Sequence, residues 1–299
     1  MKLGILVVYL VNDDNEKLLD IHLDHINKYT DATFVIYAGI NMLLPRFVEK
    51  LKQFDFVKVY DLKPYNGEFD ESRGSNEHSH YLEQLINKAL KDGAEYFVIM
   101  HPDSFPVKKG WESELIKKTS ETCPLISVFP QMSACTFFHR DFYMKYNPRL
   151  LPNNRERDSK DWLKFQKGNQ PNYLIETGMG YAFRVFQEEL EWKKLVLTNQ
   201  QDSHHHFGGV YGNMIFHLGS AAMYDRRPMQ GYVKNNSYNK FKQFVIGKIP
   251  VGIKSKLKTI IPDKVVHPEI EKNKREYLKI RDSLLNDTEN FLKSIKPID

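Results

Sequence analysis

An apolar run that ends abruptly in a histidine and an acid is the first place in this chain where chemistry could be done. Tyr96–Met100 is apolar and is followed by His101, Pro102 and Asp103. A buried strand that brings a carboxylate to its carboxyl end is a common way to place a metal or phosphate ligand in an open α/β sheet. The alternative is an acid that caps a helix or stabilises a turn. A carboxylate suits Mg²⁺ or Mn²⁺, and an imidazole from His101 is tolerated better by Mn²⁺.

Histidines also gather later in the chain. His217 follows the apolar residues Met214–Phe216, just as Asp103 follows its own apolar run. The alternative for His217 is a core histidine held by hydrogen bonds. His204–His206 are three adjacent imidazoles that cannot all face one site in a strand or helix, which favours a partly exposed loop over a metal centre. His78 and His80 lack the spacing of a metal hydrolase, so this function is disfavoured.

The elements that must position these residues alternate between strands and helices over the first hundred positions. We expect strands at Leu3–Val11, Ala32–Tyr37, Phe56–Tyr60 and Tyr96–Met100, helices at Glu16–Tyr29, Leu43–Phe54 and Tyr81–Lys91, and a loop at Lys63–Ser79. This order predicts an α/β fold, with a Rossmann-like, mostly parallel sheet flanked by helices. Ligands bind such sheets at the carboxyl ends of the strands, where Asp103 lies.

The second half is less regular. We expect short strands at Leu125–Phe129 and Cys135–Phe138, an irregular polar segment at Pro148–Gln170, a strand running into a turn at Tyr173–Gly178, a helix at Gln187–Lys194 and helical structure at Glu269–Ile295. From about Lys234 the chain is basic, with lysines alternating with aliphatic residues. Such a segment either covers its own domain or lies on an anionic membrane surface.

Composition narrows the class of protein. The chain has 299 residues, 41% hydrophobic and 27% charged, which suits a globular protein with a sizeable core. Its net charge of +5 favours anionic ligands, but no nucleic-acid-binding motif accompanies the basic residues. The apolar N-terminus is short and lacks a cleavage site, no run is long enough to span a membrane, and Cys123 and Cys135 need no disulfide. We therefore expect a cytoplasmic protein, peripheral at the inner face of the membrane if the basic segment binds lipid.

The first 120 residues resemble a GT-A glycosyltransferase of the family 2 type. The resemblance rests on the helix Tyr81–Lys91, the strand that follows it, the acid-pair-like His101-Pro-Asp103, then Pro106 and Gly110-Trp111. It implies a GT-A-like catalytic domain over residues 1–233, with a nucleotide-sugar half (1–120), an acceptor half (121–233) and a basic, mostly helical extension (234–299). This chain departs from the family at His101, which stands where the first acid is expected.

The resemblance also implies a set of site residues. Asp103 would bind Mn²⁺ or Mg²⁺ together with His101, and a late histidine, here His217, would complete the metal shell or contact the phosphates. The donor candidates are Asn12, Asp13, Arg73, Asn76, His101 and Asp103. Glu176, which precedes a glycine turn, is the first choice for the general base, with Asp202, Asp158 and Asp161 as alternatives.

The expected function is transfer of a sugar from a nucleotide-diphosphate sugar to a glycan or lipid-linked acceptor, in surface polysaccharide biosynthesis. The alternative is a non-catalytic GT-A-like protein that binds nucleotide sugars or serves as a scaffold. His101 in place of an acid favours this alternative.

Overall fold

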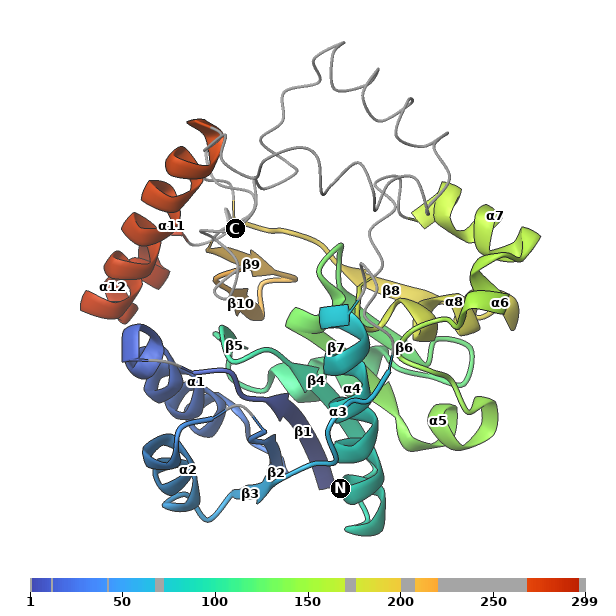
Figure 1. Cartoon of the computed structure of the whole chain (residues 1–299), viewed down its shortest axis with the longest axis horizontal. Helices are drawn as coiled ribbons and strands as arrows, with labels where there is room; N and C mark the ends of the chain where they lie inside the picture. Colours follow the sequence, from blue (N-terminus) through green and yellow to red (C-terminus); the bar gives the residue numbers. More distant parts are fainter. Residues whose placement is uncertain are drawn as a thin grey trace.

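The computed structural model describes residues 2–11, 13–41, 43–67, 73–169, 176–199, 208–219 and 268–295. Within these residues, seven strands form one sheet in the order β3-β2-β1-β4-β7-β6-β8 (Figure 1). Its strands are β1 (Lys2–Val8), β2 (Thr33–Gly39), β3 (Val57–Tyr60), β4 (Tyr96–Met100), β6 (Leu125–Val128), β7 (Cys135–His139) and β8 (Trp192–Leu195). The strands β3, β2, β1 and β4 are parallel, and β7 runs antiparallel to both β4 and β6. The predicted α/β fold with a mostly parallel sheet is confirmed.

Helices cover both faces of this sheet because its strands alternate between two apolar clusters. In β1, Leu3, Ile5 and Val7 face one cluster and Leu6 faces the other. The first cluster includes side chains of α1 (Glu16–Tyr29), α2 (Pro45–Lys52) and α4 (Trp111–Lys118). The second includes side chains of α3 (Arg73–Lys91), α5 (Arg140–Tyr146), α7 (Lys160–Asn169) and α8 (Met179–Gln187). The sheet is therefore buried on both faces, as the near-continuous apolar runs of its strands require.

A small second sheet lies beside the carboxyl end of β4. It contains β5 (Ser104–Pro106), β10 (Ile215–His217) and β9 (Gly209–Tyr211), with β10 antiparallel to both neighbours. The helices α11 (Pro268–Asn286) and α12 (Thr288–Ser294) lie on the outer side of this sheet, next to α1 (Figure 1). Short helices complete the fold at η1 (Asp13–Asn15), η2 (Met132–Ala134) and α6 (Asn154–Arg157).

Three predictions of secondary structure were wrong. The expected loop at Lys63–Ser79 ends earlier, because α3 begins at Arg73 and its first turns are polar rather than apolar. The segment Pro148–Gln170 contains α6 and α7, the former started by a capping box between Asn153 and Glu156. Gln187–Lys194 is not a helix: α8 ends at its first residue, and β8 then pairs with β6.

The structure describes only part of the second half. The basic residues 234–267 and the first three residues of the segment Tyr173–Gly178 lie outside the described residues, and the division of the chain at residue 233 stays a prediction. Among the described helices, none has the length and apolar character needed to cross a bilayer.

Candidate active site

Asp103 sits in the turn that joins the two sheets. The strand β4 ends at Met100, residues 101–103 form the turn, and β5 begins at Ser104. The Asp103 side chain is buried, and its backbone oxygen accepts a hydrogen bond of 2.9 Å from the amide of Leu218. The position is at the carboxyl end of a central strand, beside the point where the parallel order of the sheet breaks, which is where open α/β sheets bind ligands.

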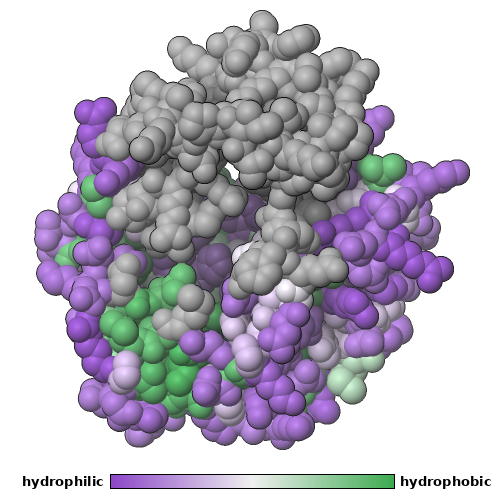
Figure 2. All heavy atoms as spheres, in the orientation of Figure 1, coloured by the Kyte–Doolittle hydropathy of each residue, from purple (hydrophilic) through white to green (hydrophobic). Residues whose placement is uncertain are grey.

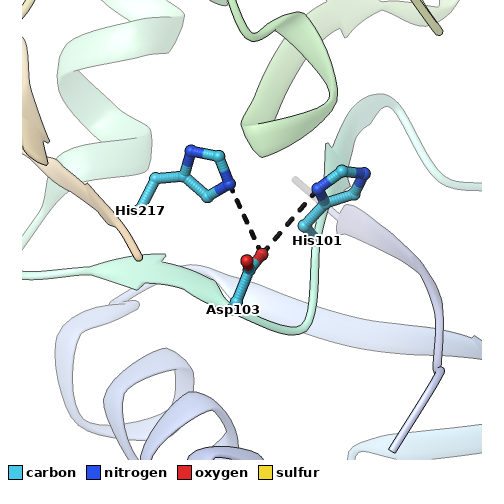
Figure 3. A group of neighbouring side chains, drawn as sticks. All are labelled: His101, Asp103 and His217. Carbon is cyan, nitrogen blue, oxygen red and sulfur yellow. Dashed lines mark ion pairs between the residues drawn. The ribbon is translucent and has the colours of Figure 1, made fainter. Parts of the chain in front are cut away.

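Pairing between β5 and β10 brings His217 to this turn. The register of the two strands places His217 opposite Ser104, and the His217 ring is buried. Its Nε2 lies 3.4 Å from Oδ1 of Asp103, and Nδ1 of His101 lies 3.8 Å from the same oxygen. Both rings point at the carboxylate from opposite sides (Figure 3). Two residues far apart in the sequence are thus joined by one short antiparallel pairing.

The three side chains suit a divalent cation. One donor atom from each lies within 4.8 Å of the other two. Ligands at about 2.0–2.2 Å from an ion lie roughly 3.0–3.4 Å apart at octahedral or tetrahedral angles, so a small contraction would close the set. Both ring nitrogens of His217 are buried and have no hydrogen-bond partner among the described residues. A buried unpaired nitrogen is costly, and a metal ion would satisfy one of them.

Burial also prepares His101 to act as a ligand. Desolvation lowers the pKa of His101 to about 4, against an opposing effect of the Asp103 carboxylate. The imidazole is therefore neutral at pH 7, which is the form that binds a metal. This residue is where the chain departs from an acid pair, and the substitution keeps a donor at the position instead of removing it.

Glu176 lies in the turn that starts α8, where its backbone oxygen accepts a hydrogen bond of 3.1 Å from the amide of Met179. Burial raises the pKa of Glu176 to about 7, and the nearby His217 ring lowers it by a smaller amount. Its charge in turn contributes, after desolvation, to the raised pKa of Tyr211, about 12. We call His101, Asp103 and His217 the metal-ligand cluster, because they are the candidate ligands of an ion. A carboxyl group with a pKa near 7 beside this cluster has the proton affinity that general base catalysis requires.

A third histidine joins the cluster, and sequence reasoning missed it. His78 lies in the second turn of α3, three residues after Ser75, and its ring centroid is 5.1 Å from that of His101. Its Nδ1 lies 3.1 Å from Oγ1 of Thr177, and burial lowers the pKa of His78 to about 3. The sequence feature that could have revealed it is the pair His78 and His80. We considered this pair only as a metal-hydrolase motif, and we expected its segment to be a loop.

Two histidines of α1 hold the β5 strand from behind. Nδ1 of His22 donates to the backbone oxygen of Ser104 at 2.7 Å, and Nδ1 of His25 donates to that of Pro106 at 3.1 Å. The carbonyl oxygens can only accept, so these ring nitrogens carry protons. The Ser104 hydroxyl also donates to the backbone oxygen of Ala134. These bonds fix the strand whose first residue follows Asp103.

The structure places the other predicted site residues as follows. Asp13 is exposed in η1 and forms an ion pair with Arg46, while Asn76 and the backbone of Arg73 belong to the first turns of α3. Asp158 caps the end of α6, and Asp161 lies in α7, 3.9 Å from Lys164. Asn12, Asp202 and the triplet His204–His206 lie outside the described residues. Asp103, His101 and His217 are brought together, Glu176 is close to them, and Asp13 is not part of the cluster.

No protein-family model and no curated protein sequence matches this chain. Solved structures that match it include a mannosyltransferase from Pyrobaculum calidifontis in complex with GDP-Man and Mn²⁺, at 12% identity and a TM-score of 0.35, over 63% of this chain and 61% of that one. Mouse xyloside xylosyltransferase 1 in its apo form is 9% identical, with a TM-score of 0.41, over 65% of this chain and 85% of that one. A glycosyltransferase involved in glycosylation of the major capsid of PBCV-1 is 11% identical, with a TM-score of 0.34, over 66% and 81%.

These solved structures are glycosyltransferases, the class that the sequence resemblance indicated. The chain spans less than two thirds of the mannosyltransferase and 30% of the Staphylococcus aureus TarS structure, which it also matches. At these identities and TM-scores, an assignment of activity has to rest on the residues of the site itself.

Proposed function

We propose that this protein is a metal-dependent glycosyltransferase that uses a nucleotide-diphosphate sugar as donor. The observation that supports this most is the convergence of His101, Asp103 and His217 at the carboxyl end of a central strand, with Glu176 beside them. Transfer of a sugar from a diphosphate requires charge stabilisation at the leaving group and a base at the acceptor hydroxyl. The cluster offers candidates for both roles.

The metal ligands in this proposal are Asp103, His101 and His217. When bound, a divalent cation stabilises the negative charge that develops on the departing diphosphate. Two imidazoles and one carboxylate form a softer donor set than carboxylates alone, so we expect Mn²⁺ to bind more tightly than Mg²⁺. The buried Asp103 carboxylate supplies the negative charge that retains the ion.

The donor nucleotide would lie along the carboxyl ends of β1 and β2. Figure 2 shows apolar side chains gathered on this face, over α1 and the ends of these strands. Leu10, which follows β1, is 50% exposed, and Leu44, which precedes α2, is 49% exposed. An exposed apolar surface at a ligand-binding edge suits the faces of a nucleobase. We propose Asn12, Asp13 and Arg73 as polar contacts to this donor, whereas Asn76, the fourth donor candidate, lines a separate hollow beside α3.

Glu176 is the proposed general base, and Asp202 is the second choice. The acceptor hydroxyl would lose its proton to Glu176 while the sugar is held by the donor site, if transfer proceeds with inversion. The acceptor is a glycan or a lipid-linked glycan, and surface polysaccharide biosynthesis is the proposed setting. Contact of the basic residues 234–267 with the cytoplasmic face of a membrane belongs to the same proposal.

A donor screen with an Asp103→Asn variant tests the function. The wild-type protein is incubated with UDP-, GDP- and CMP-sugars and Mn²⁺, and release of the free nucleotide is measured. We expect release from one donor class, reduced about a hundredfold or more in the variant. Asp141→Asn is the matched control, because Asp141 is an exposed acid 3.4 Å from a histidine, His139, on the surface. Equal turnover by wild type and Asp103→Asn would refute the role of Asp103.

A non-catalytic scaffold is the alternative, and His101 in place of an acid is the observation that favours it. Thermal unfolding with nucleotide sugars, in the presence and absence of Mn²⁺, separates the two. A glycosyltransferase site should be stabilised by donor and metal together. A protein stabilised by neither would have lost the donor site.

A further inference from the structure

A hollow beside α3 forms a second candidate site. Its volume is about 440 Å³, within the range of small-molecule sites. One wall is the face of α3 that carries Asn76, Ser79, His80 and Glu83, which recur at helical spacing. The others are the segment after β3 and the segment that follows α5. The hollow is therefore built from three elements that the fold fixes independently.

The chemistry of the lining is that of amides, hydroxyls and phenol rings. Asn76, Asn147 and Ser79 contribute amide and hydroxyl groups, and Tyr65 and Tyr143 contribute aromatic rings. Such a lining offers donors and acceptors for hydroxyl groups together with flat apolar faces for the C–H groups of a sugar ring. A site for a diphosphate would need more cationic groups than this.

Charge in the hollow is largely compensated. Both carboxylate oxygens of Glu83 accept hydrogen bonds, one from the Tyr143 hydroxyl and one from the Leu150 amide, each at 3.0 Å. Glu83 thereby anchors the segment after α5 and shapes the wall. Arg149 is the cation among the described lining residues, and it is exposed at the rim. An uncharged or weakly acidic polyol fits this balance better than a strongly charged ligand.

A chain of contacts through Thr177 connects the hollow to the metal-ligand cluster. The Ser79 hydroxyl, which lines the hollow, donates to Oγ1 of Thr177 at 3.4 Å. The same Thr177 oxygen lies 3.1 Å from His78, whose ring faces His101. Glu176, the proposed base, precedes Thr177 directly. A molecule in contact with Ser79 would therefore be separated by one hydrogen bond from Thr177, the residue that follows the proposed base.

We infer that this hollow binds a saccharide unit of the acceptor, with its hydroxyl groups on Asn76, Ser79 and Asn147 and its ring against Tyr65 or Tyr143. That the saccharide is an acceptor rests on the proposed function, but its binding can be measured without any transfer. Its direction is set by Thr177: the reactive hydroxyl points toward Glu176, and the rest of the glycan leaves past Arg149.

A glycan array probed with the full chain tests the inference. The wild-type protein is compared with His80→Trp, which fills the hollow from α3, and with Arg149→Ala, which opens its rim. Asn87→Trp is the matched control, because Asn87 is exposed on the same helix two turns further along and does not line the hollow. We expect wild type and Asn87→Trp to bind the same glycans, and His80→Trp to lose about tenfold or more in affinity.

Three results would overturn the inference: no glycan bound by the wild type, equal glycan binding by wild type and His80→Trp, or a nucleotide as the ligand whose affinity His80→Trp reduces. The Asp103→Asn variant separates the inference from the proposed function. Suppose that the Asp103→Asn variant and the wild type both bind the glycan, but the wild type turns over no donor. The hollow is then a saccharide site, and the transferase proposal fails.

Discussion

At the scale of single residues, His217 and Asp103 show how little structure is needed to assemble a candidate metal site. Three residue pairs between β5 and β10 bring the two side chains together. The buried Asp103 carboxylate then lies 3.4 Å from the His217 ring and 3.8 Å from the His101 ring, and His101 is kept neutral by its surroundings. The donor set does not need the acid that the sequence lacks at position 101.

Replacing Glu176 by glutamine tests its role as a base. The amide keeps the size of the side chain but cannot accept a proton, so we expect kcat to fall about a hundredfold to ten-thousandfold. Burial raises the pKa of Glu176 to about 7, so wild-type kcat should rise with pH through that value, and this rise should vanish in the variant. Mn²⁺ affinity, measured by electron paramagnetic resonance, should be unchanged. A variant that retains its kcat would transfer the role to Asp202.

His22 should make the stability of the fold depend on pH. Burial lowers the pKa of His22 from 6.5 to about 4, so the folded state keeps the ring neutral while the unfolded chain takes up a proton. The stability that comes from burying a neutral His22 is therefore fully present above pH 6.5 and is lost as pH falls toward 4. Between pH 7.5 and 5, the free energy of unfolding should fall by about 2 kcal/mol for this reason.

Urea unfolding of His22→Asn checks this dependence, because the asparagine amide can still donate to Ser104 but does not titrate. The free energy of unfolding of the variant should change less between pH 7.5 and 5 than that of the wild type, by about the same 2 kcal/mol. Identical pH dependence in the two proteins would show that His22 has the same pKa in the folded and unfolded states, which would contradict its burial as a neutral ring.

The sequence identified Asp103 and His217 because each follows an apolar run, and the structure brings both to one sheet edge. It could not reveal that they pair across β5 and β10, because two three-residue strands carry no periodic pattern of their own. It missed His78 for a related reason: the first turns of α3 are polar where they face the site, so they read as a loop. Local pattern finds residues at strand ends, but contacts between distant segments remain outside its reach.

At the scale of elements, the Gly110-Trp111 pair that contributed to the family resemblance has a structural explanation. Nε1 of Trp111 donates to the hydroxyl of Thr30 at 3.1 Å, and Oε1 of the buried Glu112 accepts hydrogen bonds from the amides of Asp31 and Ala32. The start of α4 therefore fastens the connection between α1 and β2. Its effect on the site is indirect, through the position of α1 behind β5.

The close approach of α8 to the segment after α5 gives a prediction at this scale. A Cβ added at Gly180 would lie 2.2 Å from the backbone oxygen of Arg149, and the Gly180 amide donates to Leu150 at 3.0 Å. Gly180→Ala should therefore lower the free energy of unfolding by about 1–3 kcal/mol, since backbone atoms must move. Gly168→Ala is the control: it lies in α7 with nothing within 4 Å, and the higher helix propensity of alanine should leave stability equal or slightly higher. Thermal unfolding of both variants measures the contrast, and equal melting temperatures would contradict the close packing.

The first half of the fold was predictable at this scale and the second was less so. Parallel strands buried on both faces have long apolar runs, and the helices between them have a clear 3.6-residue period. Trp192–Leu195, by contrast, is a β-strand with two lysines, whose place in the sheet depends on pairing with β6 and on the bond from Trp192 to Ser127. These contacts are with residues far away in the sequence, so the local pattern could not show them, and a helix was predicted there instead.

At the scale of the whole molecule, the C-terminal helices support the metal-ligand cluster from outside. Tyr277 and Leu284 of α11 are fully buried against Phe105 of β5 and Phe216 of β10. Asp103 directly precedes β5, and His217 is the last residue of β10. The last helices of the chain therefore help to set the distance between two proposed ligands that lie far from them in sequence.

Leu284→Ala tests this support. Loss of a fully buried leucine should cost about 2–5 kcal/mol in the free energy of unfolding, and the cavity should loosen the pairing of β5 with β10. We expect Mn²⁺ affinity, measured by electron paramagnetic resonance on the folded variant, to fall as well. Leu51→Ala is the matched control: Leu51 is equally buried, but on α2 at the other end of the sheet. It should lose similar stability and keep the affinity of the wild type. A parallel loss of affinity in both variants would mean that general destabilisation, rather than the contact of α11 with the small sheet, governs the metal site.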